Sequence, residues 1–140
     1  MERTSVPSER VWSQVGYSRA VRIGNLIEVA GTSASAPGGV VVAAGDLYGQ
    51  TKYCIEVIQA AIEELGGRVE DVIRTRVFLT DMSLWEEAGR AHGEVFGDIR
   101  PASAFVGTSE LLHPDLMVEI EATAVVQDDE AGSSQDPPGE

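Results

Sequence analysis

Hydrophobic and polar residues follow two different periods along this chain. Alternation or β-branched residues mark five strand-like segments, at 17–23, 26–30, 72–80, 103–108 and 116–127. Two other segments repeat apolar residues every three or four positions, as amphipathic helices do. The repeated positions are Leu47, Thr51, Cys54, Ile58, Ile62 and Leu65 in the first helix, and Leu84, Ala88, Ala91 and Val95 in the second.

Capping residues place the ends of these helices. Asp46 is a good N-cap for the first helix, and Gly66-Gly67 follows its last apolar position as a C-terminal cap would. Ser83 is expected to cap the second helix, which runs to about Phe96 and ends at Gly97-Asp98.

The remaining segments connect the elements. Gly24-Asn25 is suited to a two-residue turn and predicts a hairpin between the first two strands. Pro37-Gly38-Gly39 indicates a loop, with a possible short strand at 40–42. Residues 1–11 are polar and show no periodicity, so we expect an arm there and no regular element.

The resulting order, β-β-(β)-α-β-α-β-β, predicts a single α+β domain with a mixed β-sheet. Two helices with one apolar stripe each can cover only one face of such a sheet. The other face must stay wet or be covered by something else, and valine, alanine and other small residues would suit packing against another subunit. The pattern therefore favours an oligomer.

Composition narrows the possible partners. The chain of 140 residues carries 10 basic and 23 acidic residues, a formal charge of −13. Residues 128–140 hold five of the acids and no base, so we expect a disordered acidic tail after a domain of residues 1–127. Without the tail the charge is still −8, which is unfavourable for nucleic-acid binding.

Cysteine usage and hydropathy bear on location. Cys54 is the single cysteine, which excludes an intrachain disulfide and fits a reducing compartment. No apolar run approaches the roughly 20 residues of a membrane span, and the first residues lack a signal-peptide pattern. We therefore expect a cytoplasmic protein that has no membrane partner.

The last strand carries two carboxylates inside an apolar run. Side chains alternate between the two faces of a strand. One face holds Val118, Ile120, Ala122 and Ala124, and the other holds Met117, Glu119, Glu121, Thr123 and Val125. A strand needs no glutamates to form, so either this face is wet or the carboxylates belong to a site.

The chain resembles the Rid/YjgF family of small trimeric proteins, whose best-known members hydrolyse reactive enamines and imines. The resemblance runs from about Gly16 to Val126 and rests on the order and spacing of several short pieces. These are Gly16-Tyr17, Gly24-Asn25, Val29-Ala30-Gly31, Gly66-Gly67, Val77-Phe78-Leu79-Thr80-Asp81, Arg100-Pro101-Ala102 and Val118-Glu119-Ile120-Glu121-Ala122. It implies the chorismate-mutase-like (YjgF) fold and a homotrimer with three clefts between neighbouring subunits.

The resemblance also implies roles for particular residues. Glu119 matches the glutamate that orients the attacking water, which makes it the catalytic candidate. Tyr17 matches a tyrosine over the ligand cleft, and Gly31 and Thr32 lie where backbone groups line that cleft. The competing interpretation is that Glu119 and Glu121 solvate a subunit interface and that Tyr17 is an ordinary packed residue.

One position departs from the deaminating members. They follow Pro-Ala with an arginine that holds the substrate carboxylate, and this chain has Ser103 there. Their cysteine two residues later is Phe105, which by alternation shares the strand face of Ser103 and makes the cleft more apolar. Losing a bidentate charged pair costs roughly 2–5 kcal/mol of binding. A neutral or less polar ligand is therefore expected, unless Arg19 or Arg76 replaces the arginine; either could instead pair with surface acids.

Other chemistries find little support in the sequence. His92 and His113 lack ligand-like spacing, so no metal is expected, and no glycine-rich phosphate loop indicates a cofactor. Cys54 lies on an apolar stripe and is expected to be inert core. Two hypotheses remain, an imine or enamine hydrolase and a non-catalytic trimer that binds a small metabolite. Ribonuclease activity, attached to some family members, is disfavoured by the acidic body and the lack of a histidine pair.

Overall fold

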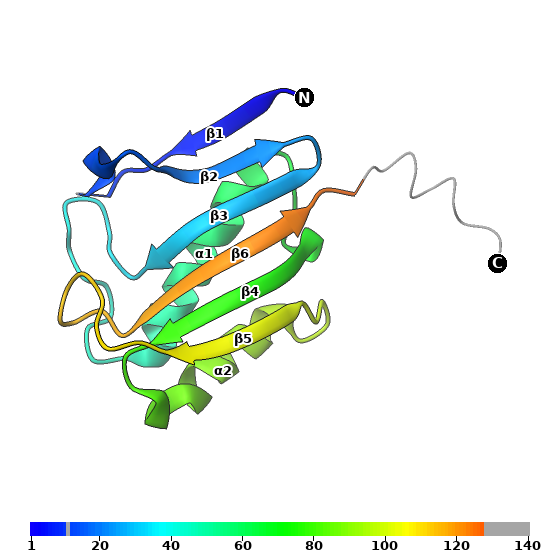
Figure 1. Cartoon of the computed structure of the whole chain (residues 1–140). Helices are drawn as coiled ribbons and strands as arrows, with labels where there is room; N and C mark the ends of the chain where they lie inside the picture. Colours follow the sequence, from blue (N-terminus) through cyan, green and yellow to red (C-terminus); the bar gives the residue numbers. More distant parts are fainter. Residues whose placement is uncertain (11, 128–140) are drawn as a thin grey trace.

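A six-stranded mixed sheet forms the centre of the molecule, and two helices cover one of its faces (Figure 1). The computed structural model describes residues 1–10 and 12–127. The strand order is β1-β2-β3-β6-β4-β5; β4 and β5 are parallel and the other neighbouring pairs are antiparallel. The elements are β1 (Arg3–Pro7), β2 (Ser18–Ile23), β3 (Leu26–Ser33), α1 (Leu47–Glu64), β4 (Val72–Leu79), α2 (Trp85–Phe96), β5 (Ala102–Gly107) and β6 (Val118–Val125).

The helix α1 forms where the apolar stripe predicts it. The Asp46 side chain accepts a hydrogen bond from the Gly49 backbone N–H, which caps the first turn. At the other end Gly66 has a φ of 89°, and the N–H groups of Gly66 and Gly67 donate to the carbonyls of Glu63 and Ile62. This is a Schellman ending, so both predicted caps of α1 are confirmed.

The main core lies between α1 and the sheet. Along β6 buried and half-buried residues alternate, with Val118, Ile120, Ala122 and Ala124 buried as predicted. They pack with the α1 stripe in one apolar cluster, which includes Cys54, Ile58 and Ile62. Glu119 and Glu121 therefore belong to the face that the helices leave bare. Neither described helix has the length and apolar character that crossing a membrane requires.

Three local predictions are wrong. Residues 3–7 form β1 and pair with β2; because Val6 alone among them is buried, the strand has no apolar periodicity to detect. Residues 40–42 form no strand, since the contact there is the single bridge between Ser35 and Val41. Asp81, and not Ser83, caps the turn Met82–Leu84 that leads into α2. The predicted tail, 128–140, lies outside the described residues.

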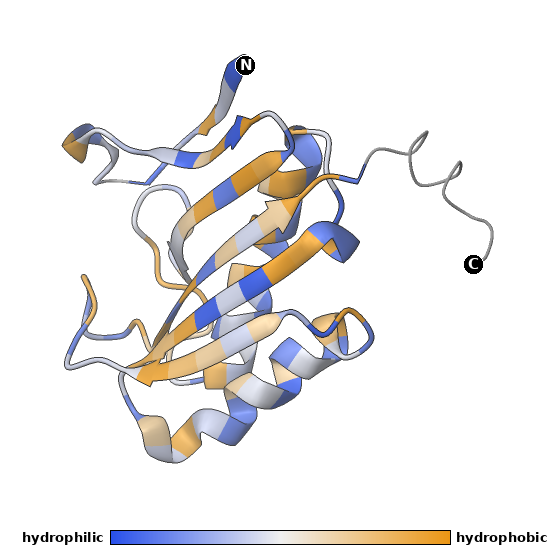
Figure 2. Cartoon of the chain, turned by 45° about the vertical axis from the view of Figure 1, so that its right-hand side comes forward, coloured by the Kyte–Doolittle hydropathy of each residue, from blue (hydrophilic) through white to orange (hydrophobic). Residues whose placement is uncertain are grey.

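The bare face of the sheet is more charged than expected. A hollow of about 280 Å³ on this face is bordered by Glu28, Arg74, Arg76, Glu121 and Thr123. Arg76 forms an ion pair with Glu121 at 3.2 Å, and the Thr123 hydroxyl donates to Glu28 at 2.7 Å. Figure 2 shows hydrophilic and hydrophobic residues alternating along the strands. Polar complementarity, in place of small apolar residues, would have to guide any packing against this face.

Candidate functional site

Glu119 is a half-buried carboxylate near the start of β6. Its neighbours in the sheet are Ser33 on β3 and Phe78 on β4. Desolvation by burial, followed by the charge of Glu121, raises the pKa of Glu119, and the attraction of Arg19 and Arg10 opposes this rise. A carboxylate whose pKa is raised in this way is better suited to take a proton from water.

The absence of a side chain at Gly31 leaves the space that the Glu119 carboxylate occupies. A Cβ at position 31 would meet the Oε2 atom of Glu119, well inside van der Waals contact. The φ of Gly31 is outside the left-handed region, so the need for glycine here is one of space. The resemblance implies that backbone groups at Gly31 line the ligand cleft, and this stays a prediction; in the described structure the Glu119 side chain lies beside Gly31.

A break in the β3 ladder surrounds Gly31. The register between β3 and β6 shifts between Val29 and Thr32, and β2 stops pairing with β3 after Val29. Arg19 fills this gap. Its Nη2 atom donates to the carbonyls of Ala30 and Gly31, at 3.0 and 2.7 Å, and to the Thr32 hydroxyl at 2.9 Å. Arg19 therefore satisfies backbone groups that the strand ladder leaves free.

Tyr17 and Arg10 complete this cluster. Tyr17 is half-buried; its ring centroid lies 5.9 Å from the Arg19 guanidinium carbon, and its hydroxyl accepts from Ser8 at 2.9 Å. Arg10 is buried and donates to the Ser33 hydroxyl at 3.2 Å. Sequence reasoning missed Arg10, because it lies in the segment predicted to be an arm.

Ser103 and Phe105 lie on the other face of the sheet. The Ser103 hydroxyl is 2.7 Å from the Thr75 hydroxyl, which is 2.9 Å from His92 Nε2 on α2. Phe105 makes edge contacts with Trp85 and His92, with ring centroids 6.3 and 5.8 Å apart. Strand alternation correctly placed the two residues together. Within one chain, however, they face α2 and not Glu119.

Thr75 and His92 were missed as partners of Ser103. Burial lowers the pKa of His92, which favours the neutral ring. The neutral ring can donate from Nε2 to Thr75, Thr75 can donate to Ser103, and Ser103 donates to the Pro101 carbonyl at 3.2 Å. This series of hydrogen bonds connects β4, β5 and α2, and the hydroxyl protons of Thr75 and Ser103 are both donated within it.

The remaining candidates behave as ordinary structural groups. Arg76 is exposed and pairs with Glu121, the alternative considered for it. Burial raises the pKa of the Cys54 thiol to about 12, as expected of an inert core cysteine. No group of three possible metal ligands occurs within residues 1–10 and 12–127.

Comparisons with known proteins agree on one family. Residues 8–126 match the family described as endoribonuclease L-PSP. A RutC family protein from Pyrococcus abyssi is 34% identical over 125 residues, covering 89% of this chain and 98% of the relative.

Solved structures give the same result. Rv2704 from Mycobacterium tuberculosis, described as a member of the YjgF/YER057c/UK114 family, is 44% identical with a TM-score of 0.81, covering 89% of this chain and 100% of that one. The YjgF gene product of E. coli is 27% identical with a TM-score of 0.76, covering 89% and 99%. This chain therefore belongs to the Rid/YjgF family, also called the endoribonuclease L-PSP family.

Proposed function

We propose that this chain hydrolyses an imine- or enamine-type small metabolite and that Glu119 holds the attacking water. The supporting observation is a half-buried carboxylate with a raised pKa, seated against Gly31. In this step Glu119 takes a proton while the water oxygen bonds to the C=N carbon. Glu119 passes this proton to the nitrogen, which gives a carbinolamine. Glu119 then moves the hydroxyl proton to the same nitrogen as the C–N bond breaks, which releases a carbonyl compound and ammonia.

The test is the hydrolysis of 2-iminobutyrate and of a neutral imine by wild-type protein and two variants. Glu119→Gln keeps the shape of the side chain but cannot take the proton, so it should lower the rate by about 10²-fold or more. Glu28→Gln, at an exposed position on the same face, is the matched control and should retain most of the rate. Equal rates for Glu119→Gln and wild type would contradict the role of Glu119.

Ser103 bears on which imine is preferred. Because Ser103 is tied to Thr75 and carries no charge, we expect wild-type protein to favour a neutral imine over a 2-imino acid. Ser103→Arg should improve 2-iminobutyrate hydrolysis, and Ser103→Arg/Phe105→Cys should do so further by making room. Wild-type rates on 2-iminobutyrate that exceed those on the neutral imine would show that another residue, Arg19 first, holds the carboxylate.

We also propose that the active form is a homotrimer, because Glu119 and the pair Ser103 and Phe105 lie on opposite faces of one chain. A neighbouring subunit could bring its own Ser103 edge toward Glu119. The bare, charged sheet face supplies a surface for such packing. Light scattering at micromolar concentration tests this, and a monomer mass would contradict it.

The second candidate is a trimer that binds a small metabolite without turning it over. The specific observation in its favour is that the position of the carboxylate-holding arginine is occupied by a hydroxyl whose bonds are satisfied within the chain. Wild-type protein that binds but does not hydrolyse either imine would favour this candidate. Ribonuclease activity has the least support, since His92 is half-buried and engaged with Thr75.

A further inference from the structure

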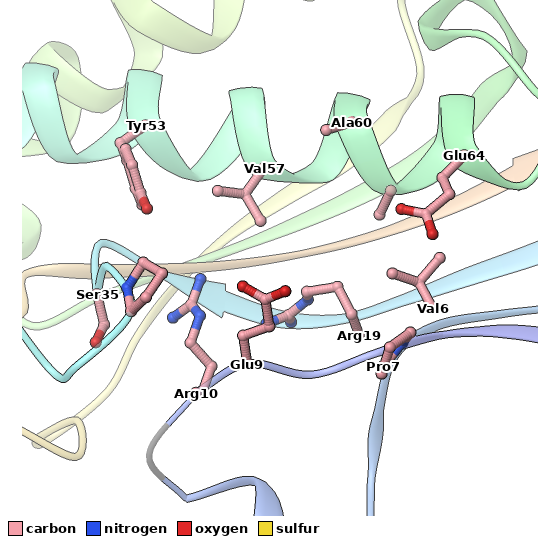
Figure 3. Close-up of a pocket in the computed structure, with 12 residues that line it drawn as sticks. Val6, Pro7, Glu9, Arg10, Arg19, Ser35, Tyr53, Val57, Ala60 and Glu64 are labelled. Atoms are coloured by element: carbon pink, nitrogen blue, oxygen red, sulfur yellow. The ribbon is translucent and has the colours of Figure 1, made fainter.

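A pocket of about 240 Å³ lies between α1 and the strands β1 and β2 (Figure 3). Glu119 does not line this pocket, so it is distinct from the proposed site of hydrolysis. Arg10 and Arg19 lie along its strand side, and residues of α1 form the opposite wall.

The two guanidinium groups are buried, and neither forms an ion pair with a described carboxylate. Arg10 is 7% and Arg19 is 6% exposed, and no described carboxylate lies within 4.0 Å of either one. Nη2 of Arg10 and both Nε and Nη1 of Arg19 are buried without a hydrogen-bond partner in the described part of the chain. Desolvation and the nearby charge of Arg10 lower the pKa of Arg19, and the attraction of Tyr17 and Glu119 offsets only part of this shift. Buried cations of this kind are costly unless an anion compensates them.

The rim of the pocket carries the opposite charge. Glu9 follows β1 and Glu64 ends α1, and both side chains are exposed and line the pocket. In Figure 3 the Glu9 carboxylate points into the space between the strands and α1, and Glu64 reaches toward it from the helix. A site with cations at its base and carboxylates at its rim is complementary to a molecule with both charges.

The walls and the volume limit the size of such a molecule. Val6, Val57 and Ala61 present apolar side chains to the pocket. Its volume corresponds to about eight waters, below the range of about 300–1,000 Å³ that is typical of pockets for drug-sized ligands. A nucleotide is therefore too large, whereas a small α-amino acid fits.

We propose that this pocket binds an α-amino acid with a small apolar side chain. Arg10 and Arg19 donate to its carboxylate, Glu9 and Glu64 accept from its ammonium group, and its side chain packs on Val57. The proposal is independent of imine hydrolysis at Glu119.

Calorimetry with three related probes tests the two charges separately. L-Valine carries both charges, isovalerate lacks the ammonium group and isobutylamine lacks the carboxylate. We expect valine to bind about ten-fold or more tightly than either analogue. Isovalerate binding as tightly as valine would overturn the proposal in favour of a simple anion site. No detectable heat with valine would overturn it as well.

Variants at exposed positions locate the site without endangering the fold. Glu9→Gln and Glu64→Gln should weaken valine several-fold and leave isovalerate unchanged, while Glu56→Gln on the exposed side of α1 is the matched control. Ala60→Phe should fill the pocket entrance and reduce valine binding about ten-fold or more. If Glu9→Gln tightens isovalerate binding, Glu9 is itself the counter-ion and the proposal fails.

A last variant separates the two sites. Glu119→Gln should lower the rate of imine hydrolysis by about 10²-fold or more without weakening valine binding. Loss of both in this variant would place valine at the hydrolytic site and overturn the proposal of a second pocket. Loss of valine binding in Ala60→Phe with hydrolysis retained would leave the hydrolytic proposal standing and support the pocket.

Discussion

Arg19 and Glu119 both contact Gly31: Arg19 donates to its carbonyl at 2.7 Å, and Glu119 occupies the space that a side chain at position 31 would need. Arg19, which bonds the free carbonyls between β2 and β3, thus also holds the Gly31 backbone against which the Glu119 carboxylate packs. The two charges attract each other, but burial has the larger effect on Glu119 and raises its pKa.

The raised pKa of Glu119 predicts a pH-dependent stability. The folded state holds this proton more tightly than the unfolded state, whose ordinary value is 4.5. The free energy of unfolding should therefore fall as pH rises from the unfolded to the folded pKa. Glu119→Gln should raise Tm above wild type at about pH 7 and lose that advantage at about pH 4. Exposed Glu110→Gln is the control, and a pH-independent difference would contradict this account.

Gly31→Ala should be destabilising for steric reasons alone. The added methyl would collide with Glu119, and overpacking of this kind costs roughly 1–3 kcal/mol. Urea unfolding measures the loss, and Gly107→Ala, where a Cβ would meet no atom within 4 Å, should be nearly neutral. Adding Glu119→Ala to Gly31→Ala should recover most of the loss; if it does not, the clash lies elsewhere.

Thr75→Val tests the hydroxyl chain between α2 and β5. The buried Thr75 hydroxyl bonds both His92 and Ser103; removing it leaves half-buried His92 Nε2 without a partner, while exposed Ser103 keeps its bond to the Pro101 carbonyl. We expect a loss of about 1–3 kcal/mol in the free energy of unfolding. Thr123→Val, whose hydroxyl bonds exposed Glu28, should cost much less. Similar losses of unfolding free energy in the two variants would argue that the hydrogen bonds of Thr75 do not stabilise the fold.

His92 should give stability the opposite pH dependence to Glu119. Burial lowers its pKa below the ordinary value of 6.5, so the unfolded state binds the proton more readily. The contribution of neutral His92 to the free energy of unfolding is fully present above pH 6.5 and is lost as pH falls through the folded-state pKa of His92. In His92→Gln the decline of Tm between about pH 7 and about pH 5 should flatten. His113→Gln, at an exposed loop position, should follow wild type.

Removal of residues 128–140 should leave the domain intact. The segment is polar and acidic and contains Asp136-Pro137-Pro138-Gly139 without an apolar anchor, so it cannot compensate for the entropy of ordering. A chain ending at Gln127 should keep the Tm and assembly mass of the full chain. A large drop in Tm would mean that the segment docks on the domain.

The sequence predicts most of the fold because the elements that form the core carry complete periodic patterns. The stripe of α1 and the alternation of β6 specify which side of each element is buried. The strand β1 lacks such a pattern, since it is held by backbone pairing with β2 and buries Val6 alone among its residues.

The candidate site was predicted less completely. Alternation showed that Ser103 and Phe105 share a face, but the register between strands decides which face that is. Val77 pairs with Phe105, whereas its neighbour Phe78 pairs with Val106 and with Glu119. Glu119 therefore lies on the sheet face opposite to Phe105 and Ser103. Contacts between distant segments, such as Arg10 with Ser33, leave no local trace in the sequence.

The pairing of β1 with a single neighbour has an evolutionary consequence. Residues 1–10 supply Glu9 and Arg10 to the pocket yet contribute little to the core. Substitutions in this segment can therefore alter the lining of the pocket while β2 to β6, α1 and Glu119 stay unchanged. If the pocket binds a ligand as proposed, the same domain would change its ligand through the first ten residues alone.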